Sequence, residues 1–276
     1  MKPRPFDYVR PDTVEEAVAL LAEHGEDARI LAGGQSLVPM LNLRLIDAAM
    51  LIDISRIAAL GDIRDLTASI EIGAAVTQNA LLAWPGLGEK LPLVAAALPF
   101  VGHFQTRNKG TVCGSIAHAD PSSELPLALA VLGGEVVLRS QAHGERVVAA
   151  AAFQMDMLTT AREPDELITA VRFPVASGQG VAFREVARRH GDFAIIAIAA
   201  VCSDRRVDLG VGGLAGRPMV ARIEAHDDPR LLADDIRRCG QGLEGYEDLH
   251  ATAAMRRDLF RNLAPQVVAE AMRCAA

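Results

Sequence analysis

The segment of residues 101–126, VGHFQTRNKGTVCGSIAHADPSSELP, limits the possible folds more than any other part of the chain. It is polar and punctuated by glycine, and over long stretches it has neither the helical nor the strand period. Connections of this length are uncommon in compact domains, and they are usually functional or mobile. We therefore expect a fold in which a long loop is held between regular elements.

Regular elements are predicted ahead of this segment. Thr13 can cap a helix while Glu16 reaches back to form a capping box, and a glycine at position 25 would end that helix. Short apolar strands are expected at residues 28–32 and 51–54. Between them lies a glycine turn, so this part of the chain is a β-α-β unit.

Further strands and helices follow from apolar periodicity and from turn residues. After the second strand we expect a strand at 69–73, a helix from Thr77, helices at 91–98 and 125–132, and strands at 135–139 and 167–173. Beyond the linker-like residues 174–180 we expect strands at 181–186, 195–201 and 207–211, then helices at 231–238, 252–263 and 265–274. The chain is expected to form two domains, residues 1–176 and residues 177–276.

Composition excludes several classes of protein. Half of the 276 residues are hydrophobic, which is enough for a sizeable core. The net charge is -7 and the basic clusters are only pairs, so nucleic acid is not an expected partner. The amino terminus has no apolar signal stretch, and the longest apolar run, residues 193–202, is shorter than the roughly 18 to 20 residues of a membrane span. We expect a cytoplasmic protein.

The four cysteines, at positions 113, 202, 239 and 274, lie far apart in the sequence. They form no C-x-x-C pair, and no histidine stands at zinc-ligand spacing. We therefore expect no metal site and no iron–sulfur cluster within this chain.

The sequence A-G-G-Q-S at residues 32–36 follows a predicted strand. Its glycines allow positive φ and a close approach of backbone to ligand, and successive N–H groups can cradle an anion. A single Gly-Gly is more often an ordinary turn. A second loop, R-N-K-G-T-V-C-G-S at residues 107–115, again offers small residues and side-chain donors. Two such loops suit a pyrophosphate held from both sides, and the absence of G-x-x-x-x-G-K-[ST] excludes a P-loop.

These motifs carry a resemblance to a known family. Together with A-H-A-D-P-x-x-E-L-P at 117–126, F-D-Y-x-x-P at 6–11 and R-E-V-A-R-R-H-G-D-F-A at 184–194, the two loops resemble the FAD-binding subunits of molybdenum hydroxylases. The resemblance covers nearly the whole chain. It implies an α+β fold, with a two-part FAD-binding domain of the PCMH or vanillyl-alcohol-oxidase type and a small carboxy-terminal domain of antiparallel sheet and helices.

The resemblance also implies which residues contact FAD. The first loop would line the pyrophosphate with Ala32, Gly33, Gly34, Gln35, Ser36 and Leu37. The opposing wall would be formed by Thr106, Gly110, Thr111, Gly114 and Ser115. Asp120 and Glu124 match family positions near the cofactor hydroxyls, although acids at this point would also suit the start of a helix.

Three later residues are assigned to the flavin ring by the same resemblance. Ile168 would pack against the ring, and Arg184 would stabilise negative charge that develops on its reduction. Phe193 would lie near the flavin face and gate access to it. Taken alone, Arg184 would be interpreted as a surface charge and Phe193 as a core residue.

Cys113 is the main departure from the family pattern, which has Thr-x-Gly-Gly where this chain has Thr111-Val-Cys-Gly114. A cysteine cannot take positive φ cheaply, so either the backbone there is unstrained or the loop differs. The simpler interpretation is a small residue that fills the place of a glycine.

Two further patterns are set aside. The glycines of residues 210–216 resemble a dinucleotide fingerprint, but Arg217-Pro218 opposes the helix that such a fingerprint needs. His103 and His118 could act as acid–base groups or tether a flavin. Without a paired nucleophile or a metal set, they are interpreted as structural or pocket-lining residues.

The family resemblance implies an oxidoreductase subunit with no catalytic residue of its own. FAD would accept electrons from 2Fe-2S clusters in a small subunit, after substrate oxidation at a molybdopterin centre in a large subunit, and pass them to an external acceptor. A dimer of heterotrimers is expected. The alternatives are a self-sufficient flavin oxidase or reductase of the same fold, and a flavin-binding protein without turnover.

Overall fold

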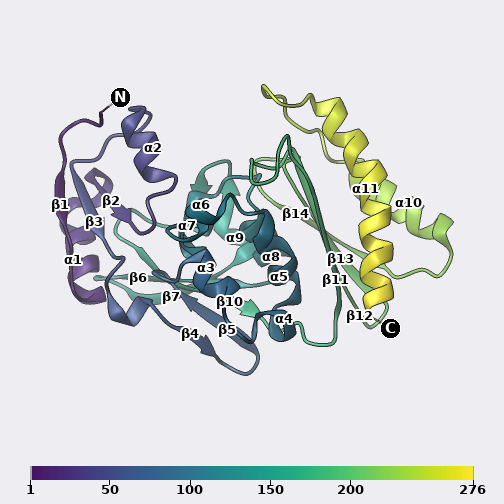
Figure 1. Cartoon of the computed structure of the whole chain (residues 1–276), viewed down its shortest axis with the longest axis horizontal. Helices are drawn as coiled ribbons and strands as arrows, with labels where there is room; N and C mark the ends of the chain where they lie inside the picture. Colours follow the sequence, from purple (N-terminus) through teal and green to yellow (C-terminus); the bar gives the residue numbers. More distant parts are fainter. Residues whose placement is uncertain (1, 276) are drawn as a thin grey trace.

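The computed structural model describes residues 2–275 and shows a mixed α/β arrangement with three main sheets (Figure 1). The first sheet is parallel, with the order β1-β3-β2, and its strands are β1 (Asp7–Val9), β2 (Ala28–Leu31) and β3 (Met50–Asp53). Helix α1 (Val14–His24) precedes β2, and α2 (Leu37–Asn42) connects β2 to β3. The expected β-α-β unit is therefore present.

Helix α1 begins and ends as its sequence predicts. The hydroxyl of Thr13 accepts a hydrogen bond from the Glu16 N–H at 3.1 Å, and Gly25 ends the helix with φ of 51°. The reciprocal half of the capping box differs from the prediction, because the Glu16 carboxylate accepts from the N–H of Asp12. The apolar face of the helix is buried in the main core.

The second sheet is antiparallel, with the order β4-β5-β10-β6-β7. Its strands are β4 (Ile63–Asp65), β5 (Ser69–Gly73), β6 (Glu135–Ser140), β7 (Gly144–Ala149) and β10 (Leu167–Pro174). Between β7 and β10 the chain forms a separate two-stranded sheet of β8 (Gln154–Asp156) and β9 (Thr159–Thr160). The helices inserted between these strands are α3 (Gln78–Leu82), α4 (Leu87–Lys90), α5 (Pro92–Ala97), α6 (Phe104–Arg107), α7 (Val112–His118), α8 (Glu124–Val131) and α9 (Ala150–Phe153). Single 3-10 turns occur at Gly25–Asp27, Ala58–Leu60 and Leu98–Phe100.

The third sheet is an antiparallel meander of β11 (Gly180–Val186), β12 (Ile196–Ser203), β13 (Arg206–Gly212) and β14 (Met219–Glu224). Helices α10 (Pro229–Gly240) and α11 (Ala253–Cys274) cover one of its faces, and α5 and α8 pack against the other (Figure 1). Successive residues of β12 therefore point into two different cores, with Ala197 and Ala199 in one and Ile196 and Ile198 in the other.

The expectations for residues 101–126 and for the last helix were wrong in part. The polar segment is not one long loop, because it contains α6, α7 and the start of α8, which are too short for periodicity to reveal. The two helices expected around Pro265 are one continuous helix, α11, with the proline inside it. Phe260, Ala264 and Val268 keep one buried face in register across the proline, which compensates for the hydrogen bond that proline cannot donate.

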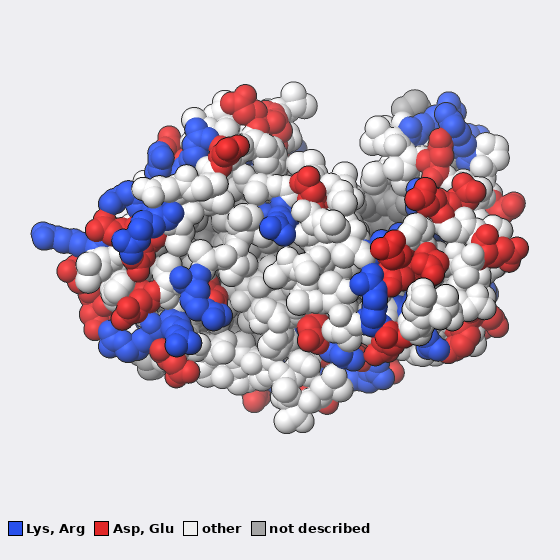
Figure 2. Space-filling view, turned by 180° about the vertical axis from the view of Figure 1, so that it is seen from behind, with Lys and Arg blue, Asp and Glu red and all other residues white. Residues whose placement is uncertain are grey.

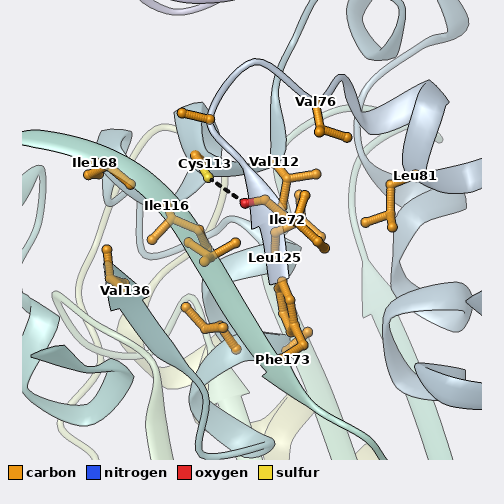
Figure 3. Close-up of a cluster of buried hydrophobic side chains, with 14 of the residues drawn as sticks. Ile72, Val76, Leu81, Val112, Cys113, Ile116, Leu125, Val136, Ile168 and Phe173 are labelled. Carbon is orange, nitrogen blue, oxygen red and sulfur yellow. Dashed lines mark hydrogen bonds between the residues drawn. The ribbon is translucent and has the colours of Figure 1, made fainter. Parts of the chain in front are cut away.

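The largest core lies beneath the second sheet, where Ile72, Phe173 and Leu125 are fully buried (Figure 3).

On the surface, acidic and basic side chains are interspersed over the face shown in Figure 2, without one large patch of a single sign. Among residues 2–275, none of the helices has the length and apolarity to cross a bilayer. The same residues contain no group of three or more potential metal ligands.

Candidate cofactor site

A cavity of about 550 Å³ lies where the first sheet and α2 face the segment from α6 to α8. Figure 2 shows a notch between the lobe that carries the amino terminus and the rest of the molecule. The cavity is lined by both glycine loops, by β10 and by the connection between β11 and β12. Segments distant in sequence therefore meet around one space.

The first loop connects the end of β2 to α2. In the part of the chain that the structure describes, none of the backbone N–H groups from Gly33 to Leu37 donates a hydrogen bond, although Val38 already bonds to the Gly34 carbonyl. Gly34 has a φ of 68°, in the left-handed region that favours glycine. Unpaired N–H groups are costly unless water or a ligand accepts from them, so this loop is suited to bind an anion.

The two loops touch through their backbones. A Cβ atom on Gly33 would stand 2.1 Å from the Lys109 carbonyl oxygen and 2.7 Å from the Cα of Gly110. No side chain fits in this space. Glycine at position 33 is therefore required by the contact between the loops, whereas glycine at position 34 is required by backbone conformation.

The second loop is fixed to α3 and α7. Gln78 donates its backbone N–H to the Gly110 carbonyl at 2.8 Å, and Thr77 and Thr111 form an isolated antiparallel bridge. The Thr111 hydroxyl caps α7 by accepting from the Gly114 N–H at 3.0 Å. The side-chain Oε1 of Gln78 is buried at the cavity without a hydrogen-bond partner among the described residues, so a polar ligand group can bond there.

Most residues proposed from the sequence lie at this cavity. Those that line it are Ala32, Gly33, Gly34, Gln35, Ser36, Leu37, Thr106, Gly110, Thr111, Gly114, Ser115, Glu124, Ile168 and Phe193. The Phe193 side chain is 63% exposed, in the connection between β11 and β12, and is therefore not a core residue.

Asp120 and Arg184, which were also proposed from the sequence, do not line the cavity. Asp120 accepts a hydrogen bond from the Ser122 N–H at 2.8 Å and shapes the turn before α8. Arg184 donates to the Glu270 carboxylate on α11 at 2.9 Å. Because side chains alternate along a strand, Arg184 points to the α11 face of the sheet and its neighbour Glu185 points to the other face.

Glu124 is the buried acid of the site, with only 6% of its surface exposed. Burial raises the pKa of its carboxyl to about 7, and the negative charge of Asp120 acts in the same direction. The Glu185 carboxyl lies close enough to form a hydrogen bond with it, and burial together with the Glu124 charge raises the pKa of Glu185 to about 8. Sequence patterns gave no signal for Glu185.

Two arginines at the cavity were also missed. Arg29 and Arg162 both line it, and burial, followed by the charge of Arg29, lowers the pKa of Arg162. Arg162 donates to the carbonyl oxygens of Glu163 and Glu166, each at 2.8 Å. Only the tertiary fold brings these two cations to the same cavity, because they lie far apart in the sequence.

Cys113 does not take positive φ. It lies in the first turn of α7, is 2% exposed, and its Sγ contacts the Ile72 carbonyl oxygen at 3.4 Å (Figure 3). Burial strongly raises the pKa of this thiol. The backbone is therefore unstrained, and the side chain fills core space as a small hydrophobic residue.

The two histidines differ in position. His118 lines the cavity, and burial lowers its pKa, whereas His103 does not line the cavity. The glycines of residues 210–216 fall at the end of β13 and in the turn that follows, as the proline at position 218 indicated.

The cavity, the two facing glycine loops and the N–H groups of residues 33–37 that donate no hydrogen bond are suited to bind a ligand that carries phosphate groups. The donor set fits FAD in this respect. Backbone N–H groups supply the anion cradle, Gln78 offers a buried acceptor, and Ile168 provides an apolar wall.

Comparisons with known proteins agree with this class. Residues 4–176 match the model of the FAD binding domain in molybdopterin dehydrogenase. The chain is 37% identical to the 6-hydroxypseudooxynicotine dehydrogenase complex subunit alpha of Paenarthrobacter nicotinovorans, with 99% of this chain and 96% of that protein covered. It is 40% identical to the carbon monoxide dehydrogenase medium chain of Afipia carboxidovorans over 73% of this chain and 70% of that one.

The solved structure of quinoline 2-oxidoreductase from Pseudomonas putida 86 superposes with a TM-score of 0.94 at 31% identity, covering 100% of this chain and 99% of that chain. The chain therefore belongs to the family of FAD-binding domains in molybdopterin dehydrogenases, and it is an oxidoreductase subunit of that class. The family expected from the sequence motifs is confirmed.

Proposed function

We propose that this chain holds FAD between its two glycine loops and transfers electrons as one subunit of a molybdenum-containing complex. The observation that carries the proposal is the row of backbone N–H groups from Gly33 to Leu37. These groups donate a hydrogen bond to no acceptor among the described residues. When bound, FAD supplies the ability to accept electrons one at a time and release them in pairs. The residues of the chain bind and orient it.

Each wall of the cavity has a separate task in this proposal. The backbone of both loops holds the diphosphate, with the Ser36 and Thr111 hydroxyls nearby. Ile168 excludes water from one side of the cavity, because it is 5% exposed and lies on β10. Glu124 serves cofactor hydroxyl groups, and Phe193 controls access from solvent.

The partners proposed are a large molybdopterin-binding subunit and a small 2Fe-2S subunit, arranged as a dimer of heterotrimers in the cytoplasm, with an external electron acceptor. The relatives named as a complex subunit and as a medium chain support a role within an assembly. We further propose that residues 1–176 form the FAD-binding domain and residues 177–276 a carboxy-terminal domain. The start of the meander sheet at Gly180 supports this division.

Titration of the purified chain with FAD tests the proposal. The wild-type chain should bind one FAD, and acid precipitation should release the flavin into the supernatant because no covalent link is proposed. Gly34→Val should weaken binding, since a β-branched residue is strained at the φ of 68° and narrows the loop.

Gly25→Val is the matched control. Gly25 also has positive φ, at 51°, but it lies at the end of α1 and its Cβ position meets no atom within 4 Å. Both variants carry backbone strain, and only the Gly34 variant should lose FAD affinity. Equal affinity in a folded Gly34 variant, or flavin that stays in the acid pellet, would contradict the proposal.

A further inference from the structure

Glu124 and Glu185 meet where the FAD-binding segment contacts the meander sheet. Glu124 is the first residue of α8, and Glu185 lies on β11, directly after the residue that faces α11. Phe183, two positions before Glu185, points to the same face and packs against Phe100 with 5.4 Å between ring centroids. The strand period therefore turns Glu185 toward α8.

The carboxyl groups of Glu124 and Glu185 lie close enough to form a hydrogen bond with each other. Ionised carboxylates only accept hydrogen bonds, so this bond exists only if one of the two groups carries a proton. Oε2 of Glu185 is buried and receives no hydrogen bond from a donor of residues 2–275. No lysine, arginine or histidine of those residues forms an ion pair with either acid, although pairs are present throughout the rest of the chain.

The surrounding groups also disfavour two negative charges. Asp120, in the turn before α8, adds negative charge next to Glu124. Asp192, in the β11–β12 connection, lines the same cavity as Glu124. His118, at the end of α7, also lines the cavity, and burial lowers its pKa and so favours its neutral form. Arg29 and Arg162 line the cavity as well. Neither arginine forms an ion pair with Glu124 or Glu185 among residues 2–275, so the nearest charges named for the pair are acidic.

We propose that Glu124 and Glu185 hold a shared proton beside the cavity, and that this proton makes the retention of FAD dependent on pH. The inference rests on the proposed function, because FAD is the ligand. FAD brings two phosphate charges and displaces water from the cavity side of Glu124, and both effects disfavour ionisation of the pair. Binding and proton retention therefore support each other.

The sign of the pH effect follows from the raised pKa values. Both carboxyls keep their protons well above the pH at which an exposed glutamate ionises, because burial penalises the charged form. As pH rises through the pKa of the pair, the shared proton is lost and two adjacent negative charges are left at the site. FAD affinity should therefore fall on the alkaline side and not on the acidic side.

Glu185→Gln is the informative variant. A glutamine amide can donate a hydrogen bond to the Glu124 carboxylate without a dissociable proton, so the contact is kept and no proton needs to be shared. Glu145→Gln is the matched control, because Glu145 is an exposed acid on β7, away from the cavity. Both variants replace one carboxyl group by one amide.

Two measurements test the inference. Infrared spectra of the chain without added FAD should show a protonated-carboxyl band near neutral pH, which disappears in alkali, is weakened in Glu185→Gln and is unchanged in Glu145→Gln. FAD titrations from about pH 6 to about pH 9 should show the dissociation constant of the wild type rising about three- to tenfold, and that of Glu185→Gln changing less than about twofold.

The outcomes separate the two claims. A wild-type spectrum without the protonated band, or a Glu185→Gln variant with the wild-type pH profile, would overturn the shared proton. A chain that shows the band but binds no FAD would leave the proton pair standing and contradict the proposed function and its link to pH.

Discussion

The backbone of Gly33 lies against the Lys109 carbonyl oxygen, so close that a Cβ atom at position 33 would stand 2.1 Å from it. This contact fixes the spacing of the two loops that form the cavity. Gly33→Ala must push the loops apart, because the obstructing atom belongs to the backbone. We expect FAD binding to weaken about ten- to hundredfold, in line with the usual cost of overpacking of about 1–3 kcal/mol.

The control for this variant is Gly88→Ala. Gly88 lies in α4, and its Cβ position meets no atom within 4 Å. Because alanine favours helix more than glycine does, this change should raise stability by up to about 1 kcal/mol and leave FAD affinity unaltered. Fluorescence titration with FAD and thermal unfolding measure the two effects. A Gly33→Ala chain with wild-type affinity would show that the loops can separate freely.

Phe193→Ala should change the reactivity of the bound flavin more than its retention. Phe193 is 63% exposed at the cavity and belongs to neither of the two loops proposed to hold the diphosphate. We expect a shifted reduction potential or a changed rate of reoxidation, measured by potentiometry and stopped-flow spectroscopy. Phe104→Ala is the control, since that ring is 60% exposed but does not line the cavity. Identical behaviour of both variants would remove Phe193 from the site.

Arg184→Ala should leave FAD affinity unchanged, because its guanidinium bonds to Glu270 on the far face of the meander sheet. The ion pair is partly exposed, so its loss should lower the free energy of unfolding by at most about 1 kcal/mol. Glu270→Ala should have the same small effect. A marked loss of FAD affinity in the Arg184 variant alone would show that this residue reaches the cofactor after all.

The glycine loops could be predicted from the sequence because their conformation and close contact require particular residue types. Gly34 needs positive φ and Gly33 needs the absence of a side chain, and no other residue type satisfies both demands. The helix boundaries at Thr13 and Gly25 were predicted for the same reason. Such local requirements can be identified without knowledge of the tertiary structure.

The direction of the Arg184 side chain could not be predicted in the same way. A motif match gives the position of a residue in the sequence but not the face of β11 to which its side chain points. A shift of one position along a strand moves the side chain to the opposite face of the sheet. The sequence did not indicate a role for Glu185 or Arg162, because the charged groups next to them, such as Glu124 and Arg29, belong to distant segments of the chain. Strands β1, β4, β7, β8, β9 and β14 were also missed, and most of them are short or lie at sheet edges, where side-chain alternation is weak.

The most direct test of the account is reconstitution of electron transfer from purified components. The FAD-loaded chain alone should be reduced by dithionite and reoxidised by an artificial acceptor, but it should oxidise no N-heterocycle, aldehyde, carbon monoxide or NADH. Addition of a molybdopterin subunit and a 2Fe-2S subunit should produce steady turnover from substrate to acceptor, and omission of either should abolish it. Steady turnover of any of these substrates by the single chain without metal would contradict the account, because the chain would then be a self-sufficient flavoenzyme.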